Sequence, residues 1–275
     1  MYSINITTTS SRLGLCSATV WSLVNQSMTP KSIDIWVSKE AYLTDFGVKD
    51  IPEWVAHLNS IKKIVNFHFT ENTGPYRKII PALRCANKDD ILVYADDDVF
   101  YGQNWLMDLV GAFNECDGTC IVASRVRVKK KNIFGKLRSY LSFDMCSSPC
   151  LLKNNFIITG VGGCILARRH IYNEYIFNDD FSKVAPKTDD IWISKIIELS
   201  GSSVFCVPSI LSHVNEIQHS VNALSHENTY VKFRENIFFR VIGKIVHSFK
   251  SYFGFKITNN DIAIARVDEY FSQRK

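Results

Sequence analysis

Strand-like and helix-like segments alternate over the first 125 residues of this 275-residue chain. Five runs that are apolar or alternating, and rich in β-branched residues, predict strands: residues 3–9, 32–38, 64–69, 91–95 and 119–125. Four segments with apolar residues at helical spacing predict helices between them: residues 13–26, 52–58, 77–86 and 105–113. Pro81 indicates a kink or a late start in the third helix. The alternation is typical of an α/β fold with a mainly parallel sheet.

The composition agrees with an ordinary globular protein, because 46% of the residues are hydrophobic and 21% are charged. It excludes wholesale disorder, a collagen-like chain and a disulfide-stapled miniprotein. The second half is less regular, with a helix expected near residues 191–199 and a last strand at 204–207. Because no linker clearly divides the chain, we expect two subdomains that share one sheet.

The sequence gives no sign of a targeting segment. Its N-terminus reads as a strand and lacks a basic region, so a cleaved signal peptide is not expected. No run of about 18 uncharged apolar residues predicts a membrane-spanning helix. We therefore expect the eight cysteines to be reduced. The pairs Cys116/Cys120 and Cys146/Cys150 are spaced more widely than the usual zinc ligands, which favours buried or incidental thiols.

A run of three carboxylates, Asp96, Asp97 and Asp98, directly follows the apolar segment 91–95. In open α/β sheets, ligands bind beyond the carboxyl ends of the strands. Adjacent carboxylates repel one another unless a cation compensates, and alternate positions on extended backbone point to the same side. Oxygen ligands suit Mg²⁺ or Mn²⁺ bridged to substrate phosphates. The alternative is a solvated acidic turn that caps the following helix.

Four motifs follow one another in a characteristic order. They are the strand end Thr8-Thr9-Ser10 before Arg12, the segment Thr73-Gly-Pro-Tyr-Arg-Lys, the run Tyr94-Ala-Asp-Asp-Asp-Val and the later Thr188-Asp-Asp-Ile-Trp. Together they resemble a GT-A fold glycosyltransferase, similar to family-2-like bacterial enzymes that build cell-surface polysaccharides, over roughly residues 3–230. The resemblance implies a Rossmann-like, mainly parallel central sheet flanked by helices. It also implies a glycosyltransferase domain over residues 1–231, with a nucleotide-sugar-binding half (1–98) and an acceptor half (99–231).

The resemblance also implies roles for individual residues on the donor side. The base and ribose are expected at Thr8, Thr9, Ser10 and Arg12, and the donor diphosphate at Arg77 and Lys78, where fixed cations offset its charge. Solvated cations at a helix start are the alternative for Arg77 and Lys78. Asp96 and Asp98 match the motif that binds Mn²⁺ or Mg²⁺; Asp98 is the expected direct ligand, while Asp96 lies nearer the ribose or a metal-bound water. Asp97 is counted with the donor site.

Three further residues are nominated by the resemblance alone. Gly162 and Gly163 would line the donor-sugar and acceptor site, with an ordinary strand bulge or turn as the alternative. His213 follows the expected last strand, where some relatives offer a third metal ligand, although a lone histidine is more often structural. His219 lies in the same region.

The second acidic pair, Asp189 and Asp190, opens the expected helix after Thr188. Thr188 at the N-cap and carboxylates in the first turn explain at least one of these residues structurally. In the resembling enzymes this pair supplies a general base, usually through its second member, which points to Asp190. The first member here is Asp rather than the commoner Glu, so the choice between Asp189 and Asp190 stays open.

Positive charge is concentrated in two segments, although the net charge is only +5. Residues 125–138 carry seven Lys or Arg residues and no acid. In residues 238–250, Arg240, Lys244, His247 and Lys250 fall on one face of an expected amphipathic helix within the tail 232–275. Such a helix suits an anionic membrane surface; the alternative is a C-terminal helix docked on the protein. The basic loop lacks interleaved aromatic residues, so nucleic-acid binding is not expected.

These observations predict a metal-dependent glycosyltransferase that uses a nucleotide-diphosphate sugar, with a UDP-sugar as the favoured donor. The expected acceptor is a hydroxyl of a saccharide, lipid-linked or on a cell-surface oligosaccharide such as lipopolysaccharide core, and inversion is expected. We expect the protein in the cytoplasm, peripheral at the inner face of the cytoplasmic membrane. The alternatives are an aspartate-nucleophile phosphatase, which normally carries its Asp on the first strand, and an inactive membrane-surface binding module, against which the intact carboxylate sets argue.

Overall fold

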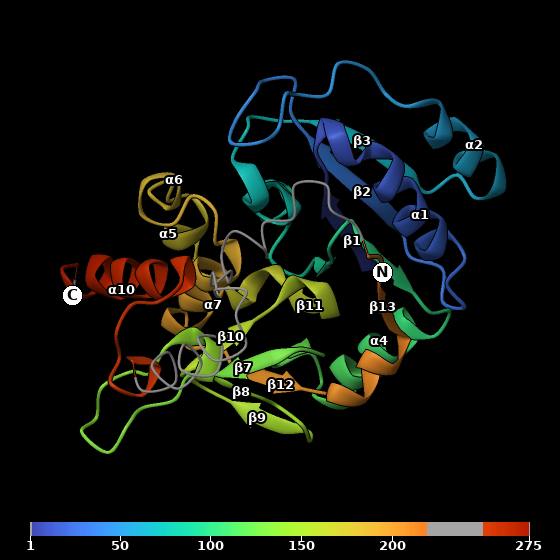
Figure 1. Cartoon of the computed structure of the whole chain (residues 1–275). Coiled ribbons are helices and arrows are strands. Elements are labelled where there is room, and N and C mark those ends of the chain that lie inside the picture. The colour runs from blue at the N-terminus through green and yellow to red at the C-terminus, as the bar shows by residue number, and fades with distance from the viewer. Residues whose placement is uncertain (1, 219–249, 275) are drawn as a thin grey trace, which may run out of the picture.

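The computed structural model describes residues 2–218 and 250–274, which fold around an eight-stranded central sheet (Figure 1). The strand order is β3-β2-β1-β4-β11-β6-β12-β9. Its strands are β1 (Tyr2–Thr7), β2 (Ser32–Val37), β3 (Val65–Phe69), β4 (Ile91–Tyr94), β6 (Ile121–Ala123), β9 (Cys150–Leu152), β11 (Cys164–Ala167) and β12 (Val204–Cys206). Only β11 and β9 run antiparallel to their neighbours. The expected mainly parallel α/β sheet is therefore confirmed.

Two smaller sheets extend this framework. One has the order β10-β7-β8 and the other pairs β13 with β5. Their strands are β5 (Val99–Tyr101), β7 (Val126–Val128), β8 (Asp144–Met145), β10 (Phe156–Ile158) and β13 (Val214–Glu216). These five strands have two or three residues each and form three antiparallel pairings, which the sequence patterns did not predict.

Helices cover both faces of the central sheet (Figure 1). The α-helices are α1 (Leu13–Val24), α2 (Glu53–Ile61), α3 (Ile80–Cys85), α4 (Trp105–Glu115), α5 (Asn173–Ile176), α6 (Phe181–Val184), α7 (Asp189–Leu199) and α10 (Asn259–Ser272). The 3₁₀ helices are η1 (Ser10–Arg12), η2 (Gly74–Lys78), η3 (Tyr140–Ser142), η4 (Gly160–Gly162), η5 (Arg168–His170) and η6 (Pro208–His213). The segment expected as one helix over 77–86 is divided into η2 and α3, because Pro81 allows an α-helix to begin only at its own first turn.

The two faces of the sheet belong to two separate cores, as the alternation along β4 shows. Leu92 and Tyr94 pack with residues of α3, α7 and α10, whereas Val93 and Ala95 pack with residues of α1, α2 and α4. Because both faces of β4 are covered, its sequence is a continuous apolar run. Such a strand delivers Asp96, two residues after its end, at a fixed place on the edge of the sheet.

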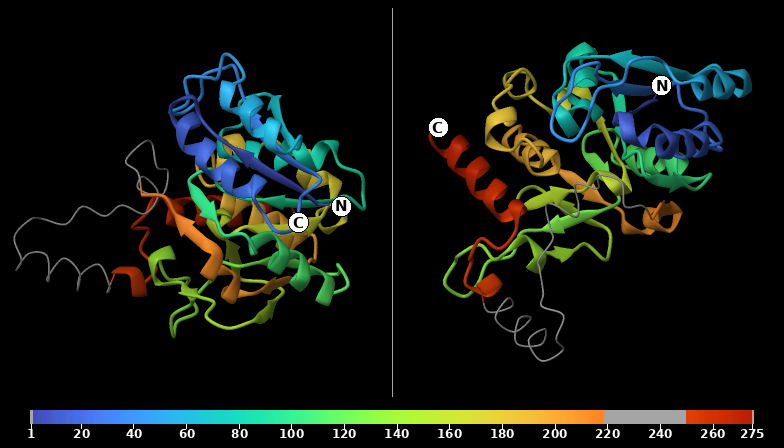
Figure 2. Two further views of the ribbon diagram at one scale, coloured as in Figure 1. Left: turned by 90° about the vertical axis from the view of Figure 1, so that its right-hand side faces the viewer. Right: turned by 45° about the horizontal axis from the view of Figure 1, so that its top comes forward.

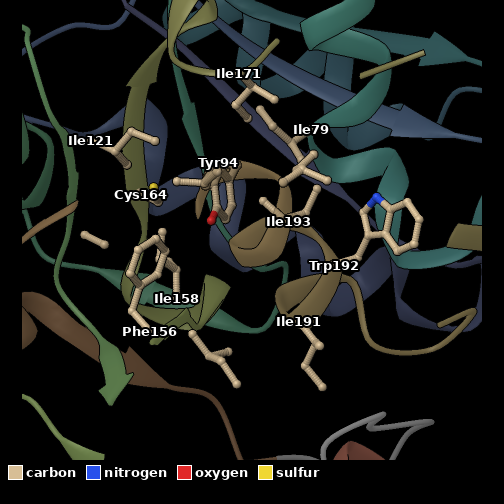
Figure 3. Close-up of a cluster of buried hydrophobic side chains, with 14 of the residues drawn as sticks. Ile79, Tyr94, Ile121, Phe156, Ile158, Cys164, Ile171, Ile191, Trp192 and Ile193 are labelled. Carbon is tan, nitrogen blue, oxygen red and sulfur yellow. The ribbon is translucent and has the colours of Figure 1, made fainter. Parts of the chain in front are cut away.

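Helix α7 is held by the first of these cores. Figure 3 shows Trp192 beside Ile191 and Ile193 of the same helix, with Tyr94 and Cys164 from the sheet nearby. Trp192 is fully buried and lies 4.9 Å, between ring centroids, from Phe271 of α10. Trp192 therefore packs in the hydrophobic core and does not face the solvent.

The C-terminal helix α10 lies alongside α7 in both Figure 1 and Figure 2. It buries Ala263, Ile264, Val267 and Phe271. Asp261, in its first turn, accepts hydrogen bonds from Ser139 Oγ at 2.8 Å and from the Tyr140 backbone N–H at 2.6 Å. The basic segment 238–250 lies outside the described residues except for Lys250, and so does His219. None of the helices formed by the described residues has the length and apolar character that a membrane crossing needs.

All eight cysteines are free thiols. Cys146 and Cys150 lie with their sulfur atoms 3.4 Å apart. Within residues 2–218 and 250–274, no group of three or more His, Cys, Asp or Glu side chains is arranged to hold a metal ion by itself. Four of the thiols, Cys16, Cys120, Cys164 and Cys206, are buried.

Candidate active site

Four strand ends meet at one edge of the central sheet. β1 and β4 are parallel neighbours, so the segments that follow them, which carry Thr8 and Asp96, leave the sheet at the same edge. β11 runs antiparallel to β4, with Cys164 opposite Tyr94, so the glycine-rich segment before β11 returns to that edge. β6 is likewise antiparallel to β11 and delivers Arg125 there. Topology alone thus brings four segments that are distant in sequence to one place.

A pocket of about 390 Å³ lies at this edge. Its lining includes ten of the residues singled out from the sequence: Thr8, Thr9, Arg12, Arg77, Lys78, Asp96, Asp97, Asp98, Asp189 and Asp190. The two carboxylate sets, separated by about 90 residues in the chain, thus face one cavity.

Lys78 joins the two carboxylate sets. Its ammonium nitrogen lies 2.8 Å from Asp96 Oδ1, 2.8 Å from Asp189 Oδ2 and 3.7 Å from Asp190 Oδ1. The side chain is only 7% exposed. Burial opposes its charge, but the surrounding carboxylates, Asp189 foremost, outweigh burial and hold the pKa of Lys78 well above its usual value. Lys78 is therefore a fixed cation at the centre of the pocket.

Asp97 and Asp98 share one cationic partner, Arg12. The guanidinium contacts Asp97 Oδ1 and lies 2.9 Å from Asp98 Oδ2. Burial raises the pKa of Asp97 to about 6, although Arg12 opposes the shift. The backbone carbonyl of Asp97 also accepts a hydrogen bond from Thr19 Oγ1 of α1, at 2.8 Å. Helix α1 thereby holds the backbone of the acidic run in place.

Arg77 has a different environment from Lys78. It is 1% exposed, donates to Asp45 Oδ2 at 2.8 Å and donates to the Thr8 carbonyl at 3.2 Å. Asp45 in turn accepts a hydrogen bond from the Ser10 backbone N–H at 3.0 Å. Arg77 lines the pocket, but it also connects the loop around residue 45 to the end of β1. Ser10 contributes to that connection and does not line the pocket.

Asp190 is the more accessible member of the second pair. Its side chain is 31% exposed, against 10% for Asp189, and its Oδ1 accepts a hydrogen bond from the Gly160 N–H at 3.2 Å. Its place in the pocket withdraws the carboxylate from bulk water and raises its pKa to about 7; Lys78 opposes this shift, and Asp189 adds to it. Thr188 occupies the N-cap position of α7, but its side chain makes no capping hydrogen bond.

The glycine-rich segment contributes through a different glycine from those singled out. A Cβ at Gly160 would come within 2.5 Å of Lys78 Nζ and 2.6 Å of Asp96 Oδ1, so only glycine leaves this space free. A Cβ at Gly163 would instead meet the Trp105 ring, and one at Gly162 would meet Ser124. None of the three glycines lines the pocket itself; Gly160 contributes through its N–H, which donates to Asp190 Oδ1, and through the space left by its missing side chain.

His213 lies away from the carboxylates. Its Nε2 is 3.1 Å from Asp108 Oδ2 on α4, and it does not line the pocket. Several lining residues were not singled out as site residues: Tyr42, Asp45, Arg125, Arg127, Tyr140, Thr159, Lys187, Glu216 and Asn260. Only the two arginines had a sequence signal, as part of the basic segment 125–138.

Comparisons with known proteins identify a family and a fold. A family model described as glycosyl transferase family 2 matches residues 12–176. Among solved structures, GalNAc-T7 with UDP, GalNAc and Mn²⁺ is similar over 93% of this chain and 50% of that chain, with a TM-score of 0.52 and 14% identity. This likeness confirms the GT-A fold.

Two other solved structures are similar over three quarters of the chain. The mannosyltransferase PcManGT from Pyrobaculum calidifontis, in complex with GDP-Man and Mn²⁺, has a TM-score of 0.49 and 16% identity over 76% of this chain and 55% of that chain. S. aureus TarS has a TM-score of 0.45 and 16% identity over 75% of this chain and 35% of that chain. The chain thus spans about half or less of the length of these proteins. No curated protein matches the sequence.

Proposed function

The chain belongs to glycosyl transferase family 2, and from this premise we propose that it transfers a sugar, with inversion, from a nucleotide-diphosphate donor to a hydroxyl of a saccharide acceptor. The observation that carries the proposal is the meeting of Asp96–Asp98 with Asp189 and Asp190 in one pocket, across Lys78. An aspartate-nucleophile phosphatase has no support from the family match, and the first of these carboxylates follows β4 rather than the first strand.

Asp190 is our candidate for the general base. The Gly160 N–H orients its carboxylate, and its pKa of about 7 makes it a stronger base than an ordinary aspartate. In the proposed step Asp190 takes the proton of the acceptor hydroxyl as the hydroxyl oxygen attacks the anomeric carbon. The bond from that carbon to the diphosphate breaks on the opposite face of the sugar. Asp189, tied to Lys78 at 2.8 Å, is a positioning residue in this scheme.

A divalent cation fits the carboxylates of Asp96 and Asp98. Their side chains are 29% and 28% exposed toward the pocket, and oxygen ligands suit Mn²⁺ or Mg²⁺. Since the described residues hold no complete metal site, we expect the protein to supply these carboxylates and the donor phosphates to supply further ligands. When bound, the cation would stabilise negative charge on the leaving diphosphate. Thr8, Thr9 and Arg12, which line the same side of the pocket, would contact the nucleoside.

Hydrolysis of UDP-sugars in the absence of acceptor tests this proposal. We expect turnover with Mn²⁺, none with EDTA, and loss of turnover in Asp98→Asn. Asp144→Asn is a matched control, because Asp144 is exposed and pairs with Lys130 outside the pocket. Turnover that persists in EDTA would refute the metal assignment. Failure to bind any nucleoside diphosphate, measured by thermal shift with and without Mn²⁺, would refute the proposed function and leave the inactive binding module.

We propose further that the acceptor is lipid-linked or part of a cell-surface oligosaccharide, and that the enzyme acts at the inner face of the cytoplasmic membrane. The support is the charge pattern of residues 238–250 in the sequence. Binding to anionic liposomes should fall in Arg240→Gln/Lys244→Gln and persist in the control Lys63→Gln/Lys88→Gln, which removes two exposed cations elsewhere. Equal binding by both double variants would contradict a membrane role for this segment.

A further inference from the structure

We propose that the acceptor carries a negatively charged group, a phosphate or a carboxylate, and that Arg127 and Arg125 bind it beside Asp190. The inference rests on the proposed function, because it concerns the acceptor half of the same pocket. It gives part of the basic segment 125–138 a role in substrate recognition.

The backbone ties these arginines to the candidate base. Arg125 directly precedes β7 and Arg127 lies within it, and both line the pocket. The Thr159 N–H donates to the Arg125 carbonyl at 3.0 Å, and the next N–H, of Gly160, donates to Asp190 Oδ1 at 3.2 Å. The successive residues Thr159 and Gly160 thus connect the backbone of Arg125 with the carboxylate of Asp190, the proposed base.

Arg127 has no carboxylate partner among the described residues. Its Nη1 donates to the Phe143 carbonyl at 3.3 Å, and its guanidinium lies 4.8 Å from the centroid of the Tyr140 ring. Arg12, Arg77 and Lys78, by contrast, each lie within 2.9 Å of a carboxylate oxygen. The carbonyl and the ring hold Arg127 in place without neutralising it, which leaves its charge for a ligand.

Among residues 2–218 and 250–274, the carboxylate partner of Arg125 is the exposed Glu216. The Arg125 Nη1 lies 3.2 Å from Glu216 Oε1, and the Glu216 side chain is 65% exposed. An exposed pair of this kind is weak, so an anionic ligand can replace it at little cost. A guanidinium binds phosphate or carboxylate through two parallel hydrogen bonds, which makes Arg suited to this recognition.

Tyr140 shows that the arginines and the base share one environment. Burial and then Asp190 raise the pKa of its phenol, while Arg127 and Arg125 act in the opposite direction. An acceptor that bridges this region would place its hydroxyl at Asp190 and its anionic group at the arginines. The donor diphosphate is also anionic, but its expected partners are the metal motif and Lys78, which lie together with a separation of 2.8 Å between Lys78 Nζ and Asp96 Oδ1. Whether the arginines bind acceptor or donor is therefore decided by experiment.

Binding of matched charged and neutral sugars measures this directly. Protein saturated with UDP and Mg²⁺ is titrated, by saturation-transfer NMR, with methyl glucuronide against methyl glucoside and with glucose 6-phosphate against glucose. We expect at least one charged probe to bind about tenfold more tightly than its neutral partner, the size of one charge-assisted hydrogen bond. The carboxylate and phosphate pairs distinguish the two anions.

The variants locate the effect. Arg127→Gln should reduce the preference to about twofold, Arg125→Gln should reduce it less, and Arg127→Lys should restore part of it. Lys130→Gln is the matched control, because Lys130 belongs to the same basic segment but pairs with Asp144 outside the pocket. A preference unchanged in Arg127→Gln would overturn the proposal.

Two further outcomes would contradict it, and they differ from failure of the proposed function. Equal affinities of charged and neutral probes for the wild-type protein would mean that no anion is recognised. Loss of UDP affinity in Arg127→Gln, measured by calorimetry with Mg²⁺, would assign the arginine to the donor instead. A wild-type protein that binds no nucleoside diphosphate at all would instead contradict the glycosyltransferase assignment.

Discussion

The two walls of the pocket handle positive charge in opposite ways. On the wall that we propose binds the donor (the donor wall), formed by Arg12, Arg77, Lys78 and Asp96–Asp98, every cation lies against a carboxylate. On the wall that we propose binds the acceptor (the acceptor wall), formed by Arg125, Arg127, Tyr140, Asp190 and Asn260, Arg127 lies against a carbonyl and a ring. Cations of the first kind stabilise the pocket, because removing one leaves buried carboxylates without their partner. Cations of the second kind are available to bind a ligand, so their loss should change ligand selectivity more than the free energy of unfolding.

Asp190→Asn should have the largest effect and separates chemistry from architecture on the acceptor wall. We expect the transfer rate to fall about 10³-fold, within the range for loss of a general base, because the amide cannot accept the hydroxyl proton. UDP affinity should stay within about twofold of wild type. Rates are measured by release of nucleoside diphosphate, with Asp144→Asn as the control. Full activity of Asp190→Asn would move the base to Asp189 or elsewhere.

Lys78→Met tests whether the donor wall is structural. Without the ammonium, Asp96 and Asp189 lose the cation that lies 2.8 Å from each of them. We expect the free energy of unfolding, measured in urea, to fall by about 3–5 kcal/mol. The control is Arg84→Met, which breaks a pair with Asp179 whose carboxylate is 66% exposed, and should cost less than about 1 kcal/mol. Similar losses in both variants would erase the distinction between the walls.

Much of the donor wall follows from the sequence because its signals are local. The apolar run expected at 91–95 is β4 (Ile91–Tyr94), and the helix expected at 105–113 is α4 (Trp105–Glu115). A buried strand followed by three carboxylates identifies the sheet edge without any knowledge of distant residues. The family match and the fold similarity confirm the architecture that these patterns predicted.

Such local signals did not predict the acceptor wall, because contacts between residues that are distant in sequence form it. β7, β8 and β10 have two or three residues each, too few for a strand period to be recognised. Asn260 reaches the pocket because Asp261 bonds Tyr140, 121 residues earlier. Likewise, sequence spacing alone does not distinguish Gly160 from Gly162 and Gly163, whereas packing against Lys78 and Trp105 does.

The dependence of the transfer rate on pH, set by Asp190, should be a smaller effect. In the metal-free protein, the pKa of Asp190 should be about 7, which ¹³C NMR of labelled aspartate would measure. The transfer rate should then rise tenfold per pH unit below the pKa of the working enzyme and level off above it, since only the ionised form accepts a proton. The unfolded chain releases the Asp190 proton near pH 4, whereas the folded protein keeps it up to about pH 7. The contribution of Asp190 to stability therefore falls as pH rises from about 4 to about 7. A pKa near 4 would contradict both expectations.

Glu216→Gln should have the smallest effect and sharpens the contrast at the rim. It removes the only carboxylate paired with Arg125 among the described residues, at 3.2 Å. We expect affinity for the preferred anionic probe to rise about twofold, because an exposed pair contributes less than about 1 kcal/mol. UDP affinity should not change. Weaker binding of the probe would show that Glu216 itself contacts the acceptor.

The bond between Asp261 and the segment 139–140 has a consequence for biosynthesis. A ribosome adds roughly 5–20 residues per second, so the 121 residues between Tyr140 and Asp261 take on the order of 10 s to appear. Before Asp261 appears, the residues of the donor wall, of the neighbouring strand β11 and of the Lys78 partner Asp189 have already been made, while the Tyr140 N–H and the Ser139 hydroxyl still lack their native acceptor. A nascent chain should therefore acquire nucleotide affinity before it acquires a finished acceptor site, and stalling translation before residue 259 should leave the first without the second.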